Sequence, residues 1–118
     1  MFTVMDEDKA KEIKNWPVTI NIPGDGGAIT KAEIRCDFLL LKQDEIDSII
    51  QAAREGDDSS DLMEKVWIGF NGVQDAAGTT IEFSAPNRDR LLKISYLRSA
   101  VTREYFNAVN GGKPKRGN

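Results

Sequence analysis

The stretch Pro17-Val-Thr-Ile-Asn-Ile22 decides the fold, because apolar and polar side chains alternate along it. A period of two is typical of a strand with one buried and one solvated face. Pro23-Gly-Asp-Gly-Gly27 follows at once and combines residues that favour a tight turn. The alternation resumes over residues 28–38. The two alternating stretches therefore predict an antiparallel hairpin.

Beyond the hairpin, the apolar residues recur at helical spacing. Gln43–Glu55 is predicted as a helix that Gly56 stops. A second predicted helix starts near Asp57–Ser60, where several residues could cap it, and runs through Phe70. Asn71-Gly72 ends that helix.

The C-terminal part of the chain predicts a short strand and two more helices. The strand is Thr79–Phe83. Ser84 can cap the next helix, whose Pro86 sits where a missing N–H is harmless. Ser95 could cap the last helix, which is closed by Asn110-Gly111-Gly112. The predicted fold class is α+β, an N-terminal antiparallel β-hairpin or small sheet packed by about four helices.

One folded unit is expected between two loosely packed ends. Residues 1–15 are polar and charged and predict a mobile N-terminal segment, in which Lys9–Lys14 could form a short helix. Residues 16–110 are expected to form a single α+β domain, since 118 residues is the usual size of one domain. Residues 111–118 predict a flexible basic tail.

The composition suits a soluble globular protein. Hydrophobic residues make up 40% and charged residues 30% of the chain, which argues against disorder over most of it. No apolar run approaches the ~20 residues needed to span a bilayer, and the first residues lack the pattern of a secretory signal. We therefore expect a protein that stays in the cytoplasm and binds no membrane.

Histidine is absent, and Cys36 is the only cysteine. The commonest general base and most transition-metal sites are thereby removed, and no internal disulfide can form. We expect no enzymatic activity, no catalytic residue, no cofactor and no metal site. A carboxylate-based enzyme stays an alternative, because the sequence cannot place two carboxylates at a set distance.

The charge is unevenly spread along the chain. The net charge is −3, but Lys113, Lys115 and Arg116 lie in a terminal segment that has no acidic residue. Residues 1–109 hold 13 basic and 19 acidic residues. An acidic body repels phosphate backbones, so nucleic-acid binding is not expected.

Two motifs have a functional and a structural interpretation. Gly24-Asp-Gly-Gly27 could suggest a phosphate loop, but a strand pattern follows instead of a helix, which favours a hairpin turn. Asp57, Asp58 and Asp61 could suggest a calcium site, but they lack the spacing of a calcium loop. Helix capping and the favourable charge at a helix N-terminus explain them better.

Four large aromatic residues lie on the predicted helices: Trp67, Phe70, Tyr105 and Phe106. Packing in the core is the default for such residues. Because Tyr105 and Phe106 are adjacent, they cannot both face the same core, and one of them is expected at the surface or an interface. The four are our candidate partner-binding residues.

The order of these segments resembles the tail assembly chaperones of long-tailed bacteriophages and prophages. The resemblance runs through most of residues 16–118 and includes Trp16-Pro-Val-Thr-Ile-Asn-Ile-Pro23, the glycine-rich turn and the helix 43–55. Its most specific part is Trp67, then Gly72-Val-Gln-Asp75, then Gly78, then Phe83-Ser84 opening a helix.

This resemblance implies a non-enzymatic chaperone that binds the tape measure protein, a very long helical chain with exposed apolar stripes. The chaperone keeps that chain soluble while tail tube subunits polymerise around it. The tail tube protein and further copies of the chaperone are additional expected partners. The family acts in the cytoplasm of the bacterial host and is absent from the mature virion.

Many members of this family also have a longer form made by ribosomal frameshifting. Gly111-Gly112-Lys113 is compatible with a slippery codon run of that kind. The alternative function is a structural minor tail or tail-completion protein that is retained in the virion. A small enzyme or a regulator is the third possibility.

Overall fold

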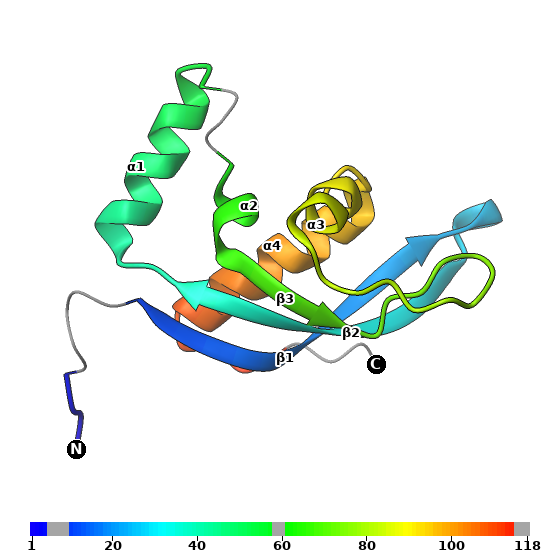
Figure 1. The fold of residues 1–118 in the computed structure, drawn as a ribbon, viewed down its shortest axis with the longest axis horizontal. Helices are drawn as coiled ribbons and strands as arrows, with labels where there is room; N and C mark the ends of the chain where they lie inside the picture. The colour runs from blue at the N-terminus through cyan, green and yellow to red at the C-terminus, as the bar shows by residue number, and fades with distance from the viewer. Residues whose placement is uncertain (5–9, 58–60, 115–118) are drawn as a thin grey trace.

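A computed structural model describes residues 1–4, 10–57 and 61–114. These residues form an α+β fold, a three-stranded sheet with four α-helices, as the sequence predicts (Figure 1). The elements in chain order are β1 (Lys11–Pro23), the 3₁₀ turn η1 (Asp25–Gly27), β2 (Ile29–Leu40), α1 (Gln43–Arg54), α2 (Leu62–Val66), β3 (Trp67–Asn71), α3 (Ala85–Leu91) and α4 (Ser95–Val109).

The sheet is antiparallel throughout, in the order β1-β2-β3. The predicted hairpin is confirmed, with Val18 opposite Ile34 and Ile22 opposite Thr30. Gly26 and Gly27 take φ values of 66° and 82° in the turn, a region that L side chains rarely adopt. The glycine cluster therefore closes a hairpin and does not open a helix that could hold a phosphate.

The core lies between the sheet and α4, which crosses behind the sheet in Figure 1. The apolar face of the hairpin meets the apolar stripe of α4, and the buried apolar residues of these elements are Val18, Ile20, Ile34, Cys36, Phe38, Leu97, Ala100, Val101, Tyr105 and Ala108. Tyr105 also ties α4 to the end of β2. Its hydroxyl donates to the Leu39 carbonyl at 2.9 Å and accepts from the Leu41 amide at 3.2 Å.

Strand β1 forms one edge of the sheet and includes two prolines, Pro17 and Pro23. Arg103 of α4 reaches this edge, where its Nη2 donates to the Thr19 carbonyl at 3.2 Å. Trp16, also on β1, donates its indole Nε1–H to the buried Glu104 carboxylate at 3.0 Å. Two side chains of α4 thus anchor β1. Arg103 binds its backbone, and Glu104 binds the Trp16 side chain.

The predicted helix through Phe70 is wrong in its second half. Helix α2 ends at Val66, and Trp67–Asn71 is the edge strand β3, paired with β2. A Cβ on Gly69 would collide with the side chain of Asp37 on β2. Glycine lets the two strands approach closely there, and burying Trp67 and Phe70 against the sheet outweighs continuing the helix.

The N-terminal segment differs from the prediction at its inner end. The possible helix over Lys9–Lys14 is not formed in its described part, since β1 starts at Lys11 and Ile13 pairs with Phe38. The register shifts between Ile13 and Trp16. At this bulge Asn15 has a φ of 57°, and its N–H donates to Asp37 Oδ1 at 2.9 Å.

The strand predicted over Thr79–Phe83 is also absent. Only an isolated bridge joins Thr80 to Gln74, and the Ile81 amide donates to the Val73 carbonyl at 2.9 Å. Phe83 still packs edge-on against Phe70, with ring centroids 5.3 Å apart. The alternation in this segment belongs to a loop that places Ile81 and Phe83 against the core.

The last two helices follow the predicted boundaries closely. Ser84 caps α3, because its hydroxyl accepts from the Asn87 amide at 3.1 Å. The predicted Ser95 cap is wrong, because Ser95 is the first residue of α4 and Ile94 holds the capping position without a side-chain hydrogen bond. Gly111 follows α4 with a φ of 75°, as expected of a helix stop. Lys115 and Arg116 of the predicted basic tail lie outside the described residues.

Candidate functional site

An open groove of about 400 Å³ lies between α1, α2 and α4. We call it the α1 groove. Its walls combine apolar side chains with a few charged ones, and the lining residues are Ile49, Ile50, Ala53, Arg54, Asp61, Leu62, Met63, Arg98, Thr102 and Phe106. A mostly apolar concave surface with few polar groups is typical of a binding site.

Helix α1 forms one wall of the groove and rises away from the sheet (Figure 1). Its apolar positions Ile46, Ile49, Ile50 and Ala53 follow the i, i+3, i+4, i+7 spacing of an amphipathic helix. Of these four residues, only Ile46 is fully buried. Ile49 and Ile50 are half-buried, and Ala53 is exposed. Most of the apolar stripe of α1 therefore lies along the groove without being fully covered.

The opposite wall is held by an ion pair between Asp61 and Arg98. Asp61 is also the N-cap of α2, where Oδ1 accepts from the Met63 amide at 3.0 Å. The capping interpretation is confirmed for Asp61, while Asp58 lies outside the described residues. Because one carboxylate serves both the cap and the pair, α2 is fixed relative to α4.

Two contacts set the positions of α1 and α2 on α4. The Leu41 amide, just before α1, donates to the Tyr105 hydroxyl. Asp61, just before α2, meets Arg98 two turns earlier on α4. The two helices that form the other walls of the groove are therefore anchored at different points along α4.

The four predicted aromatic residues divide between core and groove. Trp67 and Tyr105 are fully buried, and Phe70 is 6% exposed. Phe106 is half-buried and lines the groove, with its ring 5.7 Å from that of Tyr105. The adjacent pair therefore splits between core and surface, as expected. Trp67, Phe70 and Tyr105 supply packing, and Phe106 alone of the four lines the groove.

Most residues of the groove were not among the sequence candidates. The spacing of Ile49 and Ile50 predicts an amphipathic helix, but it does not indicate that the apolar stripe stays half-covered. The positions of Arg98 and Thr102 opposite α1 depend on how α4 crosses the sheet, which no local pattern gives. The sequence signal that points to this region is the amphipathic pattern of α1, followed by a segment rich in acidic residues.

Two buried groups outside the groove could suggest chemistry. Cys36 is completely buried, and burial raises the pKa of its thiol well above the ordinary value, while the neighbouring Trp67 lowers it less. Such a thiol is a poor nucleophile. Glu104 is also inaccessible, and its carboxylate accepts from Trp16 and from Asn107 Nδ2 at 3.4 Å. Both groups belong to the packing of α4 on the sheet.

Over the described ranges, no group of three or more His, Cys, Asp or Glu side chains is arranged to hold a metal ion. None of the helices in those ranges has the length and apolarity needed to cross a membrane. The α1 groove is thus the feature from which a function can be argued. No family model, curated protein or solved structure matches the chain.

Proposed function

We propose that this chain is a tail assembly chaperone that binds helical segments of a tape measure protein in the α1 groove. The observation that carries the proposal is the half-covered apolar stripe of α1 facing α2 and α4 across that groove. The resemblance described for residues 16–118 supplies the identity of the partner.

The groove suits an amphipathic helix for physical reasons. A long unpaired amphipathic helix aggregates unless its apolar face is covered, and an apolar groove covers it by removing that face from water. Ile49, Ile50 and Phe106 offer partly exposed apolar surface from two walls. Met63 also lines the groove, but it is only 3% exposed and supports the groove from the core.

The chaperone would act in the cytoplasm of the bacterial host, before the tail is complete. Binding through a small open groove is reversible, so the growing tube of tail tube protein can displace it. The chain would then be absent from the finished particle. A minor tail or tail-completion protein would instead remain in the particle, which makes the two functions separable by experiment.

Co-expression tests this proposal directly. The chain is produced with the long helical protein encoded next to it, and the soluble yield and co-purification of that protein are measured. We expect both to rise with the wild-type chain and to fall with Ile50→Ser. Ile29→Ser, at an exposed position on the hairpin far from the groove, is the matched control and should behave as wild type.

Two results would contradict the proposal. The first is an unchanged soluble yield of the long helical protein without any co-purification. The second is detection of the chain by mass spectrometry in purified particles at the copy number of a structural protein, which would favour the minor tail protein.

A further inference from the structure

Exposed apolar side chains gather at the beginning of the chain. Met1, Phe2 and Val4 are three of the five large hydrophobic residues that are exposed in the described ranges. Phe2 is 85% and Val4 is 66% exposed, and neither is among the residues that pack against the core. A cluster of exposed apolar side chains marks a surface that contacts another molecule. We call residues 1–4 the apolar arm.

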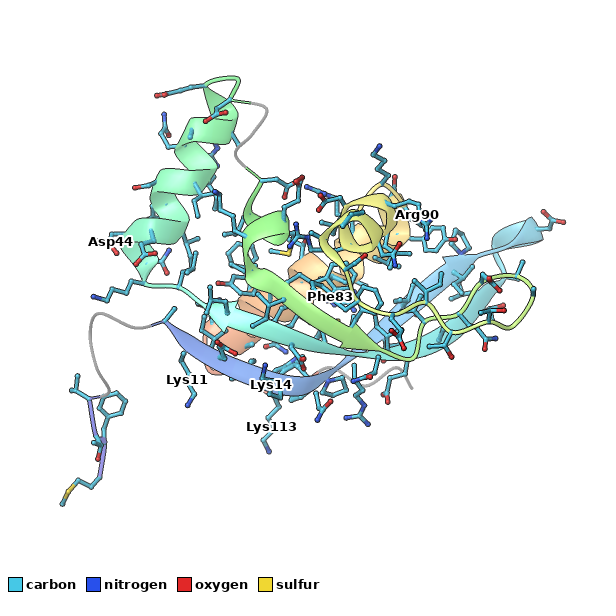
Figure 2. All side chains as sticks on the ribbon, in the orientation of Figure 1. Lys11, Lys14, Asp44, Phe83, Arg90 and Lys113 are labelled. Atoms are coloured by element: carbon cyan, nitrogen blue, oxygen red, sulfur yellow. The ribbon has the colours of Figure 1, made fainter. Side chains whose placement is uncertain are left out.

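The apolar arm lies beyond the β1 edge of the sheet, away from the α1 groove of its own chain. In Figure 1 the described N-terminal residues stand apart from α1. Figure 2 marks the two sides with Lys11, at the start of β1, and Asp44, at the start of α1. The ten residues that precede β1 can span at most about 36 Å. The arm can therefore reach a neighbouring molecule without any change in the sheet.

The α1 groove is an uncovered apolar surface that matches the arm. The half-buried apolar residues that line it are Ile49, Ile50, Leu62 and Phe106. Its charged lining residues are Arg54, Arg98 and Asp61, and the last two are paired with each other. The groove thus favours an occupant with apolar side chains and little charge. Residues 1–5 of the sequence meet this requirement, because none of their side chains is charged.

We propose that the apolar arm of one copy of this chain docks in the α1 groove of a second copy. Phe2 and Val4 would lie against Ile50 and Phe106, which removes apolar surface of both copies from water. The exchange can be reciprocal, because each copy carries both an arm and a groove, and a reciprocal exchange closes as a twofold dimer. The inference goes beyond the proposed function, since it requires no tape measure protein.

The small size of the arm sets the strength of this association. Stable interfaces bury about 1,200 Å² or more, which a four-residue arm does not reach. The dimer should therefore be weak and should increase with protein concentration. Salt should affect it little, because salt screens charges and the contact is apolar. A helix that binds in the groove would displace the arm, so the arm would cover the apolar groove until a partner arrives.

Disulfide trapping tests the contact between copies of the full chain. The native Cys36 is completely buried, so the introduced cysteines are the ones that react. Copies with Thr3→Cys, which keeps the apolar side chains of the arm, are mixed with copies with Ala53→Cys, at an exposed position of the groove. The mixed disulfide-linked dimer is measured by mass spectrometry in a glutathione redox buffer.

We expect the mixed dimer to form at least about tenfold faster with Ala53→Cys than with Ile29→Cys, because a disulfide requires its two Cα atoms to lie close together. Ile29 is the matched control, since it is exposed on the hairpin and does not line the groove.

Further variants locate the contact on each copy. Phe2→Ser with Val4→Ser, added to the Thr3→Cys copies, changes only exposed side chains, so the fold should persist, as circular dichroism can verify. Ile50→Ser is added to the Ala53→Cys copies. Each change should slow the mixed disulfide by about fivefold, as expected when apolar surface is no longer buried. Ile29→Ser in the Ala53→Cys copies should leave the rate unchanged.

Three results would overturn the inference. The first is an equal rate for the Ala53→Cys and Ile29→Cys copies. The second is a rate that neither the arm variant nor Ile50→Ser changes. The third is a chain with both Thr3→Cys and Ala53→Cys that closes an internal disulfide as a monomer while mixed copies stay separate, because the arm would then occupy its own groove. None of these results contradicts the proposed function, which co-expression with the long helical protein tests separately.

Discussion

Glu104 is a carboxylate that solvent does not reach, and its hydrogen bonds come from neighbouring side chains. A buried charge is tolerated only while it is well hydrogen-bonded. Trp16→Phe removes the indole donor and should lower the free energy of unfolding by about 2 kcal/mol, the size of a hydrogen bond to a charged group. Urea denaturation measures this loss.

The control for that substitution is Tyr96→Phe, at an aromatic side chain that is 41% exposed. It should change the free energy of unfolding by less than about 0.5 kcal/mol, as surface substitutions usually do. If Trp16→Phe changes the free energy of unfolding as little as Tyr96→Phe does, the other donors around Glu104 are enough to stabilise its charge. Trp16 then contributes only its packing.

Tyr105 is the second side chain whose polar atom joins distant parts of the chain. Tyr105→Phe loses the bonds to Leu39 and Leu41 and leaves two backbone groups without this partner. We expect the free energy of unfolding at pH 7 to fall by about 1–3 kcal/mol.

The same residue predicts a pH dependence. Burial raises the pKa of Tyr105 above its ordinary value of 10.0, so the unfolded chain loses this proton first. The stabilisation is complete below pH 10 and is lost as pH rises through the folded-state pKa. Wild type should therefore lose stability above pH 10 more steeply than Tyr105→Phe. Parallel curves for the two proteins from pH 8 to 11 would contradict this assignment.

At the scale of elements, β3 depends on a close approach to β2. Gly69→Ala introduces a Cβ that meets the Asp37 side chain, whose Oδ1 also holds the Asn15 amide at the β1 bulge. We expect a loss of about 1–3 kcal/mol in the free energy of unfolding. In an Asp37→Ala background the added loss from Gly69→Ala should be smaller, and an additive double mutant would show that the two side chains do not interact.

Helix α1 has little support from its own chain. A 12-residue helix is marginal in water alone, and α1 has a single fully buried side chain, whereas α4 has six buried residues. We expect the amides of α1 to exchange with deuterium at least tenfold faster than the most protected amides of α4. Binding of a helical peptide should slow exchange in α1 selectively, and equal protection of both helices in the free chain would be the contrary result.

At the scale of the whole molecule, local patterns predicted the hairpin and several helix termini, but not where α2 ends or how distant elements meet. Alternation of apolar and polar side chains identified β1 and β2, although Thr19 on the polar side of β1 is also buried. Trp67–Asn71 was assigned to a helix because Val66, Trp67 and Phe70 also fit helical spacing, and the pairing of Gly69 with Asp37 depends on residues 32 positions apart. The groove could not be predicted for the same reason, since Ile50 and Phe106 line it from different helices.

The covered edge of the sheet limits how this molecule can associate. In an antiparallel strand, alternate residues turn their N–H and C=O to the same side, and Thr19 turns its carbonyl outward to Arg103. Pro17 and Pro23 lie an even number of positions from Thr19, so they face outward as well. Neither proline has an N–H to donate there. An incoming extended chain finds no continuous ladder on β1, and β3 at the far edge is only five residues long. The backbone of this sheet therefore offers little for strand-by-strand association with another protein.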